Sequence, residues 1–198
     1  MRILHYSLGL FPYRAGGLNR YCTDLMKEQS KEHEVALLYP SGYRWWKRYC
    51  FVSKPCNMNG IDCYKLVNAL PVPLLYGIRQ PKDFYGKQIS VKSFERFYSA
   101  FKPDILHLHT LMGLSEYALV FFKDKGVRII YTSHDYFGIC PKVNMINEKG
   151  ELCEGPDAER CAICNLNAPS ALFLRMRNSG FALWLRNVER WIRNTLRS

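Results

Sequence analysis

The chain has 198 residues and a mass of 23.2 kDa, enough for one α/β domain and too little for two domains with separate cores. Hydrophobic residues make up 48% of it and charged residues 23%, a composition that excludes a disordered chain, a collagen and a long coiled coil. The formal net charge of +11 at pH 7 favours acidic partners, namely nucleotide phosphates, nucleic acid or an anionic membrane surface.

Strands and helices are expected to alternate along the chain. Apolar runs predict strands at residues 2–7, 34–39, 61–67, 104–108 and 127–132. Apolar residues at helical spacing predict helices at residues 17–30, 90–101 and 114–123. The remainder of 41–90 shows no sustained periodicity, and we expect loops there. This alternation is typical of an α/β fold with a parallel sheet covered on both faces.

The beginning of the chain does not have the pattern of a targeting segment. The apolar stretch in residues 1–7 is shorter than the core of a signal peptide, and no small-residue cleavage site follows it. No apolar run approaches the roughly 20 residues of a membrane-spanning helix. We therefore expect a cytoplasmic protein whose eight cysteines are reduced thiols rather than a disulfide framework.

The loop after the first strand is rich in glycine. Gly16 and Gly17 are adjacent and stand directly before the first predicted helix. Paired glycines let a backbone approach a ligand closely, and the positive end of the helix suits a phosphate or a sugar hydroxyl. The alternative is a turn that only connects strand and helix, because the loop lacks the three spaced glycines of the dinucleotide-binding fingerprint.

Histidines follow two of the later strands. His107 and His109 flank one leucine, so strand alternation places both on the same face. They could bind a metal ion, or one could be a hydrogen-bonded core residue and the other line a cleft. His134 and Asp135 follow the next strand and are adjacent, but adjacency alone does not make a catalytic dyad.

Three motifs occur in one order along the chain: Ala15-Gly16-Gly17 with Tyr21, then residues 103–109 (PDILHLH), then Ser133-His134-Asp135. Together they resemble the N-terminal domain of family 4 glycosyltransferases, which are retaining enzymes of the GT-B fold. The resemblance implies a Rossmann-like, doubly wound domain that shapes the acceptor side of a cleft, with the glycine loop close to the donor phosphates. It also implies that His134 lies near the transferred sugar and is the catalytic candidate. The binding candidates that it implies are Gly16, Gly17, His109, His134 and Asp135.

The chain also departs from that family. Nothing in it corresponds to the second, donor-binding domain, and the Glu-x7-Glu spacing of Glu151 and Glu159 lies inside a cysteine-rich loop, where we interpret it as coincidence. The chain ends before the last strand expected of an N-terminal domain. We therefore expect one incomplete domain over residues 1–198 that transfers no sugar by itself, because the missing half would supply the groups that stabilise the leaving phosphate.

Four cysteines crowd a loop at residues 135–165. They are Cys140, Cys153, Cys161 and Cys164, in the pattern C-x12-C-x7-C-x2-C. The last pair has the spacing of two thiolates that bind one ion from a tight turn, and four sulfur ligands favour a closed structural Zn²⁺ site over an iron–sulfur cluster, since nothing indicates redox chemistry. A subset of family 4 resembles the chain here, with a His-Asp-Tyr segment, a Cys-Pro pair and a later Cys-x-x-Cys. The alternative is a set of free thiols.

Two segments combine basic and aromatic residues. A terminal amphipathic helix is expected at about residues 169–197. Its apolar face would hold Phe181, Trp184, Leu185, Val188, Trp191 and Ile192, and its basic face Arg186, Arg190, Arg193 and Arg197. Such a helix suits an anionic bilayer, but helices of this kind more commonly pack their apolar face on the sheet and leave the arginines in solvent. The second segment, residues 43–49 (YRWWKRY), could line an acceptor groove or contact lipid headgroups.

The sequence thus predicts the acceptor-side half of an enzyme that uses a nucleotide-sugar donor and a glycan or lipid-linked acceptor in polysaccharide biosynthesis, in contact with the inner face of an anionic membrane. Two alternatives stay open. One is a noncatalytic partner of a split glycosyltransferase. The other is a zinc-stabilised basic module that binds nucleic acid, which is less favoured because the basic residues are divided between a helix face and one loop.

Overall fold

The computed structural model describes residues 1–179, 182 and 188. Its centre is a mixed sheet in the order β3-β5-β2-β1-β6-β7, with β4 paired to β5. The strands are β1 (Arg2–Tyr6), β2 (Glu34–Pro40), β3 (Phe51–Val52), β4 (Cys56–Met58), β5 (Ile61–Val67), β6 (Ile105–Leu108) and β7 (Arg128–Tyr131). The five strands β5, β2, β1, β6 and β7 are mutually parallel. This topology confirms the predicted α/β, Rossmann-like fold.

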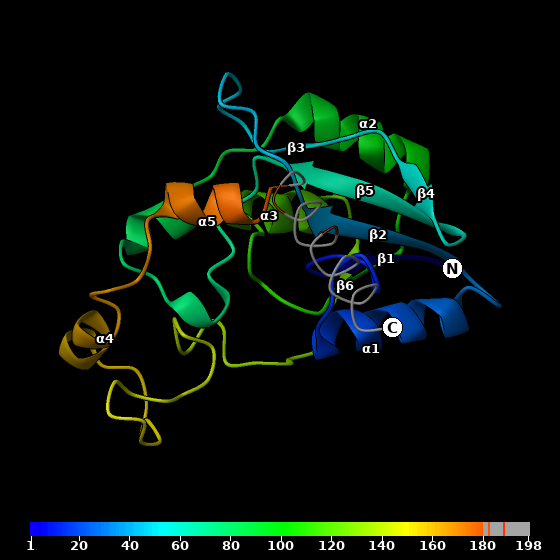
Figure 1. Cartoon of the computed structure of the whole chain (residues 1–198). Coiled ribbons are helices and arrows are strands. Elements are labelled where there is room, and N and C mark those ends of the chain that lie inside the picture. Colours follow the sequence, from blue (N-terminus) through cyan, green and yellow to red (C-terminus); the bar gives the residue numbers. More distant parts are fainter. Residues whose placement is uncertain (180–181, 183–187, 189–198) are drawn as a thin grey trace.

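The helices that connect the parallel strands and cover the two faces of the sheet (Figure 1) are α1 (Gly17–Gln29), α2 (Val91–Phe101) and α3 (Glu116–Asp124). The shorter helices α4 (Ala158–Cys164) and α5 (Ala171–Arg177) follow β7, and short 3-10 turns are η1 (Leu74–Tyr76) and η2 (Pro81–Phe84). Figure 1 shows α1 on one side of the sheet and α2 on the other. Among the described residues, no helix is long and apolar enough to cross a membrane.

Each face of the sheet has its own apolar core. The larger core lies on the side of α2 and α3, where the fully buried rings of Phe94 and Phe122 pack against Leu4, Leu66 and Leu106. On the other side, Cys22 and Met26 of α1 pack on alternate residues of β2 and β5. Burying both faces explains why the parallel strands have nearly continuous apolar sequences.

The structure adds elements that the sequence pattern did not predict. Two short strands, β3 and β4, run antiparallel to β5 in a region expected to be mostly loops. The helix α4 lies inside the cysteine-rich loop, where a tight turn was expected, because the side chain of Asp157 caps it by accepting a hydrogen bond from the backbone N–H of Arg160 at 2.8 Å.

The predicted terminal helix falls only partly on described residues. Its first part is α5, which begins after the N-cap residue Ser170 and ends at Arg177. Of its expected apolar face only Val188 is described, and all four arginines of its basic face lie outside the described residues.

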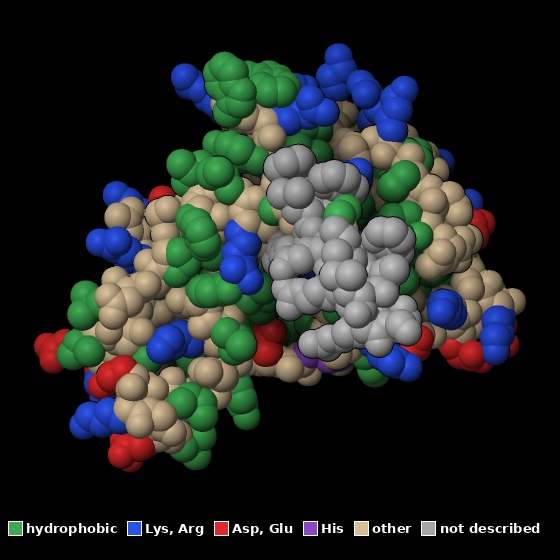
Figure 2. All heavy atoms as spheres, viewed as in Figure 1, with side chains coloured by type: hydrophobic (Ala, Val, Ile, Leu, Met, Phe, Trp, Pro, Cys, Tyr) green, Lys and Arg blue, Asp and Glu red, His purple; other side chains and the backbone are tan. Residues whose placement is uncertain are grey.

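Basic side chains gather at one edge of the molecule. Figure 2 shows a group of Lys and Arg side chains beside large apolar ones at the upper end of the view. This edge includes the loop between β2 and β3, in which Trp45 is 79% exposed.

Candidate functional site

The candidate site lies where the order of the parallel strands reverses direction. The chain leaves β1 through α1 to reach β2 on one side, and β6 and β7 lie on the other. In open parallel sheets, ligands bind beyond the carboxyl ends of the strands at this switch point. The glycine loop follows β1, and His109 and His134 follow β6 and β7, so all three segments meet at this edge.

A set of buried polar residues holds the glycine loop in place. Ser7 Oγ donates to Asn19 Oδ1 at 2.9 Å, and the backbone N–H of Phe11 donates to Thr23 Oγ1 at 3.1 Å. Gly16 is the N-cap of α1 and has φ 136°, a conformation that side-chain-bearing residues rarely adopt. Around a Cβ built on Gly17 there is open space. The loop is therefore held in a defined conformation, and its backbone at the start of α1 is open to solvent.

Three histidine rings form a hydrogen-bonded chain beneath this loop. His5 Nε2 lies 2.8 Å from Gln29 Oε1, and His5 Nδ1 lies 2.9 Å from His109 Nε2. His109 Nδ1 in turn lies 3.3 Å from His134 Nε2. His5 and His109 are buried, and His134 is half-buried. The chain thus runs from the end of α1 through the protein interior to a residue at the surface.

Burial keeps the two inner rings neutral. The pKa of His5 is lowered to about 4, first by burial and then by His107, against an opposing effect of the hydrogen bond with Gln29. The pKa of His109 is lowered to about 3, first by burial and then by His107, His5 and His134. A neutral imidazole has one N–H donor and one acceptor nitrogen. When one nitrogen of a ring donates, the other must accept, so the direction of one hydrogen bond determines the direction of the next.

The direction of the chain follows from Gln29. Its carbonyl oxygen accepts from His5 Nε2, which therefore carries the proton, and His5 Nδ1 accepts from His109 Nε2. His109 Nδ1 must then accept from His134 Nε2. A neutral His134 in this arrangement has its lone pair on Nδ1, the nitrogen outside the chain. The core thereby orients His134 and selects its tautomer.

His107 is the fourth ring of this cluster. Its Nε2 lies 2.8 Å from Thr132 Oγ1, and its ring centroid lies 4.3 Å from that of His109, so both histidines share one face as predicted. Burial and His134 lower the pKa of His107. In the described part of the chain, His5, His107 and His109 are the one group of three or more potential metal ligands whose ligand atoms all lie within 4.8 Å of one another. Both nitrogens of His5 and of His109 already make hydrogen bonds.

Tyr21 joins the glycine loop to the histidines. Its ring packs edge-on against His134, with centroids 4.8 Å apart, and against His109 at 5.9 Å. Because Tyr21 lies on the second turn of α1, the helix start with Gly16 and Gly17 is close to His134. Asp135 lies beside His134 in sequence, but its Oδ1 accepts from the backbone N–H of Phe137 at 2.9 Å. The ring partners of His134 are therefore His109 and Tyr21, and Asp135 shapes the following turn.

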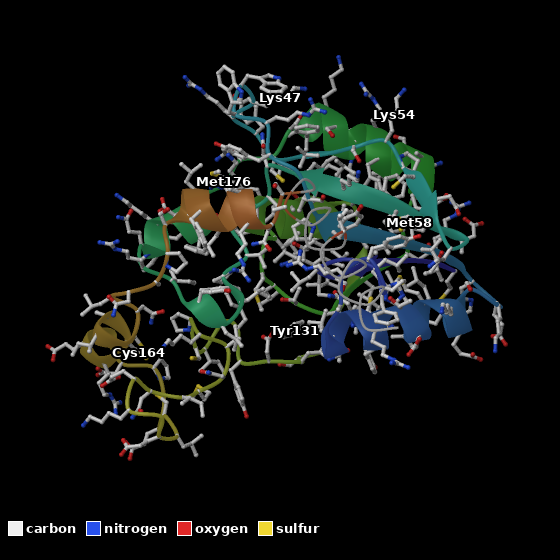
Figure 3. All side chains as sticks on the ribbon, viewed as in Figure 1. Lys47, Lys54, Met58, Tyr131, Cys164 and Met176 are labelled. Atoms are coloured by element: carbon white, nitrogen blue, oxygen red, sulfur yellow. The ribbon has the colours of Figure 1, made fainter. Side chains whose placement is uncertain are left out.

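The four cysteines of the loop line one separate cavity. Cys140, Cys153, Cys161 and Cys164 all border a space of about 380 Å³, and none of them forms a disulfide. Cys161 and Cys164 lie three residues apart on α4, which places them on one helix face. Figure 3 shows Cys164 at the edge of this projecting part of the molecule, far from Tyr131 at the end of β7. No three of these sulfur atoms lie within 4.8 Å of one another, as the ligand atoms of the three histidines do.

Hydrogen bonds attach the cysteine-rich loop to the body of the domain. The buried side chain of Asn165 accepts from the backbone N–H of Ile78 at 2.8 Å and donates to the carbonyl of Cys161 at the same distance. Within the loop, Asn147 closes a turn by accepting from the backbone N–H groups of Lys149 and Glu151. These hydrogen bonds form a turn at residues 147–151.

His5 and Gln29 are functional candidates that the sequence pattern did not reveal. His5 stands in an apolar strand where a buried polar ring needs a partner, and that need is the signal that could have found it. Its register partner in the neighbouring strand is His107, a pairing that only the topology shows. Ser7 and Asn19, which order the glycine loop, were likewise not predicted.

Solved structures and family models show what the chain is similar to. Among solved structures, the chain is similar to the catalytic domain of starch synthase IV from Arabidopsis thaliana bound to ADP and acarbose. The identity is 20% and the TM-score 0.39, over 68% of this chain and 34% of that one, so the chain spans about a third of that structure's length. No curated protein sequence matches it. The model of the family described as Glycosyltransferase Family 4 matches residues 15–197; because this match covers most of the sequence, the chain belongs to glycosyltransferase family 4.

Proposed function

We propose that this domain forms the acceptor side of a glycosyltransferase that uses a nucleotide-sugar donor, with His134 as the residue that faces the transferred sugar. The observation that carries the proposal is the hydrogen-bonded chain from Gln29 through His5 and His109 to His134 at the switch point of the sheet. It gives one half-buried imidazole a fixed orientation.

The chemistry of such a site follows from its polar groups. A neutral His134 with its lone pair on Nδ1 accepts a hydrogen bond from a sugar hydroxyl, and Tyr21 limits the space beside it. The first backbone N–H groups of α1, after Gly16, face the same edge and suit phosphate oxygens of the donor. His109 is the positioning residue in this proposal, because it acts through His134. Glycan or lipid-linked acceptors are the partners that we propose, in polysaccharide biosynthesis.

The proposal is tested in extracts of cells from which the gene has been deleted. Added wild-type protein is expected to restore transfer of labelled sugar from a nucleotide-sugar donor to the glycan or lipid fraction, and His134→Ala protein is expected not to. His33→Ala is the matched control, because His33 lies outside the network. Full restoration by His134→Ala would contradict the role of His134, and no restoration by wild-type protein would contradict the function.

The isolated chain is expected to give no transfer from nucleotide sugars. The first backbone N–H groups of α1 would contact the donor phosphates from one side only, and a leaving nucleoside diphosphate also needs basic or backbone donors from the other side of a cleft. Turnover by the purified chain, at a rate that His134→Ala abolishes, would contradict this expectation and leave the role of His134 intact.

We further propose that the cysteine-rich loop binds one structural Zn²⁺. The donor set fits the ion, since four thiols border one cavity and two of them share a helix face. When bound, zinc would supply folding free energy to a projecting loop that has little apolar core of its own. Cys140, Cys153, Cys161 and Cys164 would hold it.

Metal analysis of untagged protein tests the zinc proposal. We expect about one equivalent of zinc in the wild type and in Cys56→Ser, the control, and loss of it in Cys161→Ser/Cys164→Ser. Less than about half an equivalent of any metal in the wild type would contradict the proposal.

A further inference from the structure

A second surface, rich in basic and aromatic side chains, lies away from the histidine chain, at the loop between β2 and β3. We define the tryptophan loop as residues 43–49. Trp45 is 79% exposed, Trp46 57% and Tyr49 55%, so three large aromatic side chains face solvent within five residues. These side chains do not contribute to the core, and clusters of exposed aromatic residues are typical of interaction sites.

The tryptophan loop has a defined conformation because one buried asparagine holds it. Asn68 follows β5 and is 2% exposed. Its Oδ1 accepts from the backbone N–H of Arg44 at 2.7 Å, and its Nδ2 donates to the carbonyl of Lys47 at 2.7 Å. Further contacts from Nδ2 reach the carbonyls of Arg44 and Tyr49. The aromatic side chains are thus presented on a fixed backbone.

Beneath the loop lies a cavity whose charged side chains are all positive. It has a volume of about 760 Å³ between the loop, β3 and the start of α2. The basic residues that line it are Lys47, Arg48, Lys54, Lys92 and Arg96. The sequence contains no Asp or Glu between Glu34 and Asp62, and none of these five cations pairs with a carboxylate in the described part of the chain.

The walls of this cavity are also fixed. Ser93 on α2 both accepts from the backbone N–H and donates to the carbonyl of Val52, each at 2.9 Å. A smaller cavity of about 480 Å³ on the other side of the loop includes Arg44, Lys54 and Lys65. Trp46 and Lys54 border both spaces. Figure 3 shows Lys47 and Lys54 at the same outer edge of the molecule.

We propose that the tryptophan loop and the basic cavity beneath it dock the protein on a membrane of anionic phospholipids, with a lipid phosphate in the cavity and Trp45 and Trp46 at the headgroup level. Exposed indoles prefer the membrane–water interface, and clustered Lys and Arg side chains are attracted to anionic lipids. Two signals together, one apolar and one basic, are what stable peripheral binding needs.

The geometry favours a membrane over single-stranded nucleic acid. Trp45 and Trp46 pack edge-to-face, with an interplanar angle of 87° and centroids 5.7 Å apart. Successive bases of a single strand stack on the free faces of aromatic side chains that lie one after another along the strand. The loop between β2 and β3 projects from the molecule (Figure 1), and Trp45 at its tip is 79% exposed. A projecting tip can enter a headgroup layer while the cations beside it contact phosphates.

The test is flotation of the full chain with vesicles, compared between neutral phosphatidylcholine and phosphatidylcholine mixed with phosphatidylglycerol. Wild-type protein is expected to float with the anionic vesicles only. Each Lys or Arg near an anionic surface contributes about fivefold to binding, so Lys47→Gln/Arg48→Gln is expected to weaken partition by roughly 25-fold. Trp45→Ser/Trp46→Ser is expected to weaken it as well and to reduce the blue shift of tryptophan fluorescence on vesicle binding.

Lys27→Gln/Lys123→Gln is the matched control, because it removes the same charge from exposed residues outside the patch. It is expected to float like the wild type. Equal flotation with both kinds of vesicle, or equal losses in Lys47→Gln/Arg48→Gln and the control, would overturn the proposal. Urea unfolding midpoints like that of the wild type show that each variant is folded.

Two soluble probes separate the other sources of phosphate. If glycerol phosphate saturates the cavity and the protein does not float with anionic vesicles, the ligand is a free phosphate and membrane docking is wrong. If Lys47→Gln/Arg48→Gln loses binding to a single-stranded oligonucleotide but floats like the wild type, the surface binds nucleic acid and docking is wrong. Flotation that glycerol phosphate weakens supports a lipid phosphate in the cavity.

Discussion

Lowering the pH should destabilise this domain through its buried histidines. His5 and His109 stay neutral in the folded chain because their pKa values lie at about 4 and about 3, whereas an unfolded histidine has a pKa of about 6.5. Below about pH 6.5 the unfolded state therefore binds protons that the folded state does not, so the free energy of unfolding falls as the pH falls. The loss continues down to the folded pKa values.

The size of the effect follows from the difference between the two states. Between about pH 7.5 and about pH 5, each unfolded histidine gains ~2 kcal/mol from protonation, while His5 and His109 in the folded state gain almost none. Together they remove ~4 kcal/mol, a large share of the roughly 5–15 kcal/mol that stabilises a typical domain. His107, whose pKa is also lowered, adds to this loss.

Urea unfolding at the two pH values measures the effect. In His109→Gln, the acid-induced loss of stability is expected to be smaller by ~2 kcal/mol than in the wild type, and comparing each protein with itself removes the cost of the substitution. His33→Gln is the control. If His109→Gln loses as much stability as the wild type between the two pH values, burial does not keep this imidazole neutral and the directed hydrogen-bonded chain is wrong.

Two other substitutions test the backbone around these surfaces. Asn68→Ala removes the four side-chain hydrogen bonds from Asn68 to the backbone of residues 44–49 and is expected to cost ~2–4 kcal/mol in urea unfolding and to speed tryptic cleavage in that loop; unchanged cleavage would contradict it. Gly113→Ala, at φ 82°, places a Cβ 3.0 Å from Tyr6 Oη and 3.1 Å from Pro40 Cβ, whereas Gly60, at φ 81°, faces open space. Gly113→Ala should therefore cost at least ~1 kcal/mol more than Gly60→Ala, and equal costs would refute the packing argument.

The longer elements could be predicted because their periodicity reflects burial. The strands at 34–39 and 61–67 and the helix at 90–101 agree with β2, β5 and α2 to within one residue at each end. The short strands β3 and β4 have two and three residues, too few for a period to show. They form because they pair with the edge of β5. This edge exists only when the sheet has assembled, so a local sequence pattern does not show it.

The candidate site was predictable only in its surface members. Gly16, Gly17 and His134 follow strand ends, where a sequence pattern points to them. His5 and Gln29 join the site through the parallel register of β1 with β6 and the packing of α1 on the sheet, which bring together residues more than a hundred positions apart. The two cysteines on α4 were predicted as ligands on a tight turn, but Asp157 caps a helix there. The capping residue determines the geometry of the two thiols, and their role as metal ligands stays a prediction.

Hydrogen-bonded histidines stabilise a core less than apolar side chains would. Their presence in this core therefore indicates another role. The histidine rings on the α1 side of the sheet could be replaced by apolar residues, which need no hydrogen-bond partners. A buried polar group adds little net stability and is costly when one of its hydrogen bonds is lost. Instead, His5, His109 and Gln29 satisfy one another along a line that ends at His134. An apolar core would pack β1 on β6 equally well, but it would leave the ring of His134 free to choose either tautomer. The arrangement is therefore best explained by what it does at His134, whose ring is held beside Tyr21 at the edge where α1 begins.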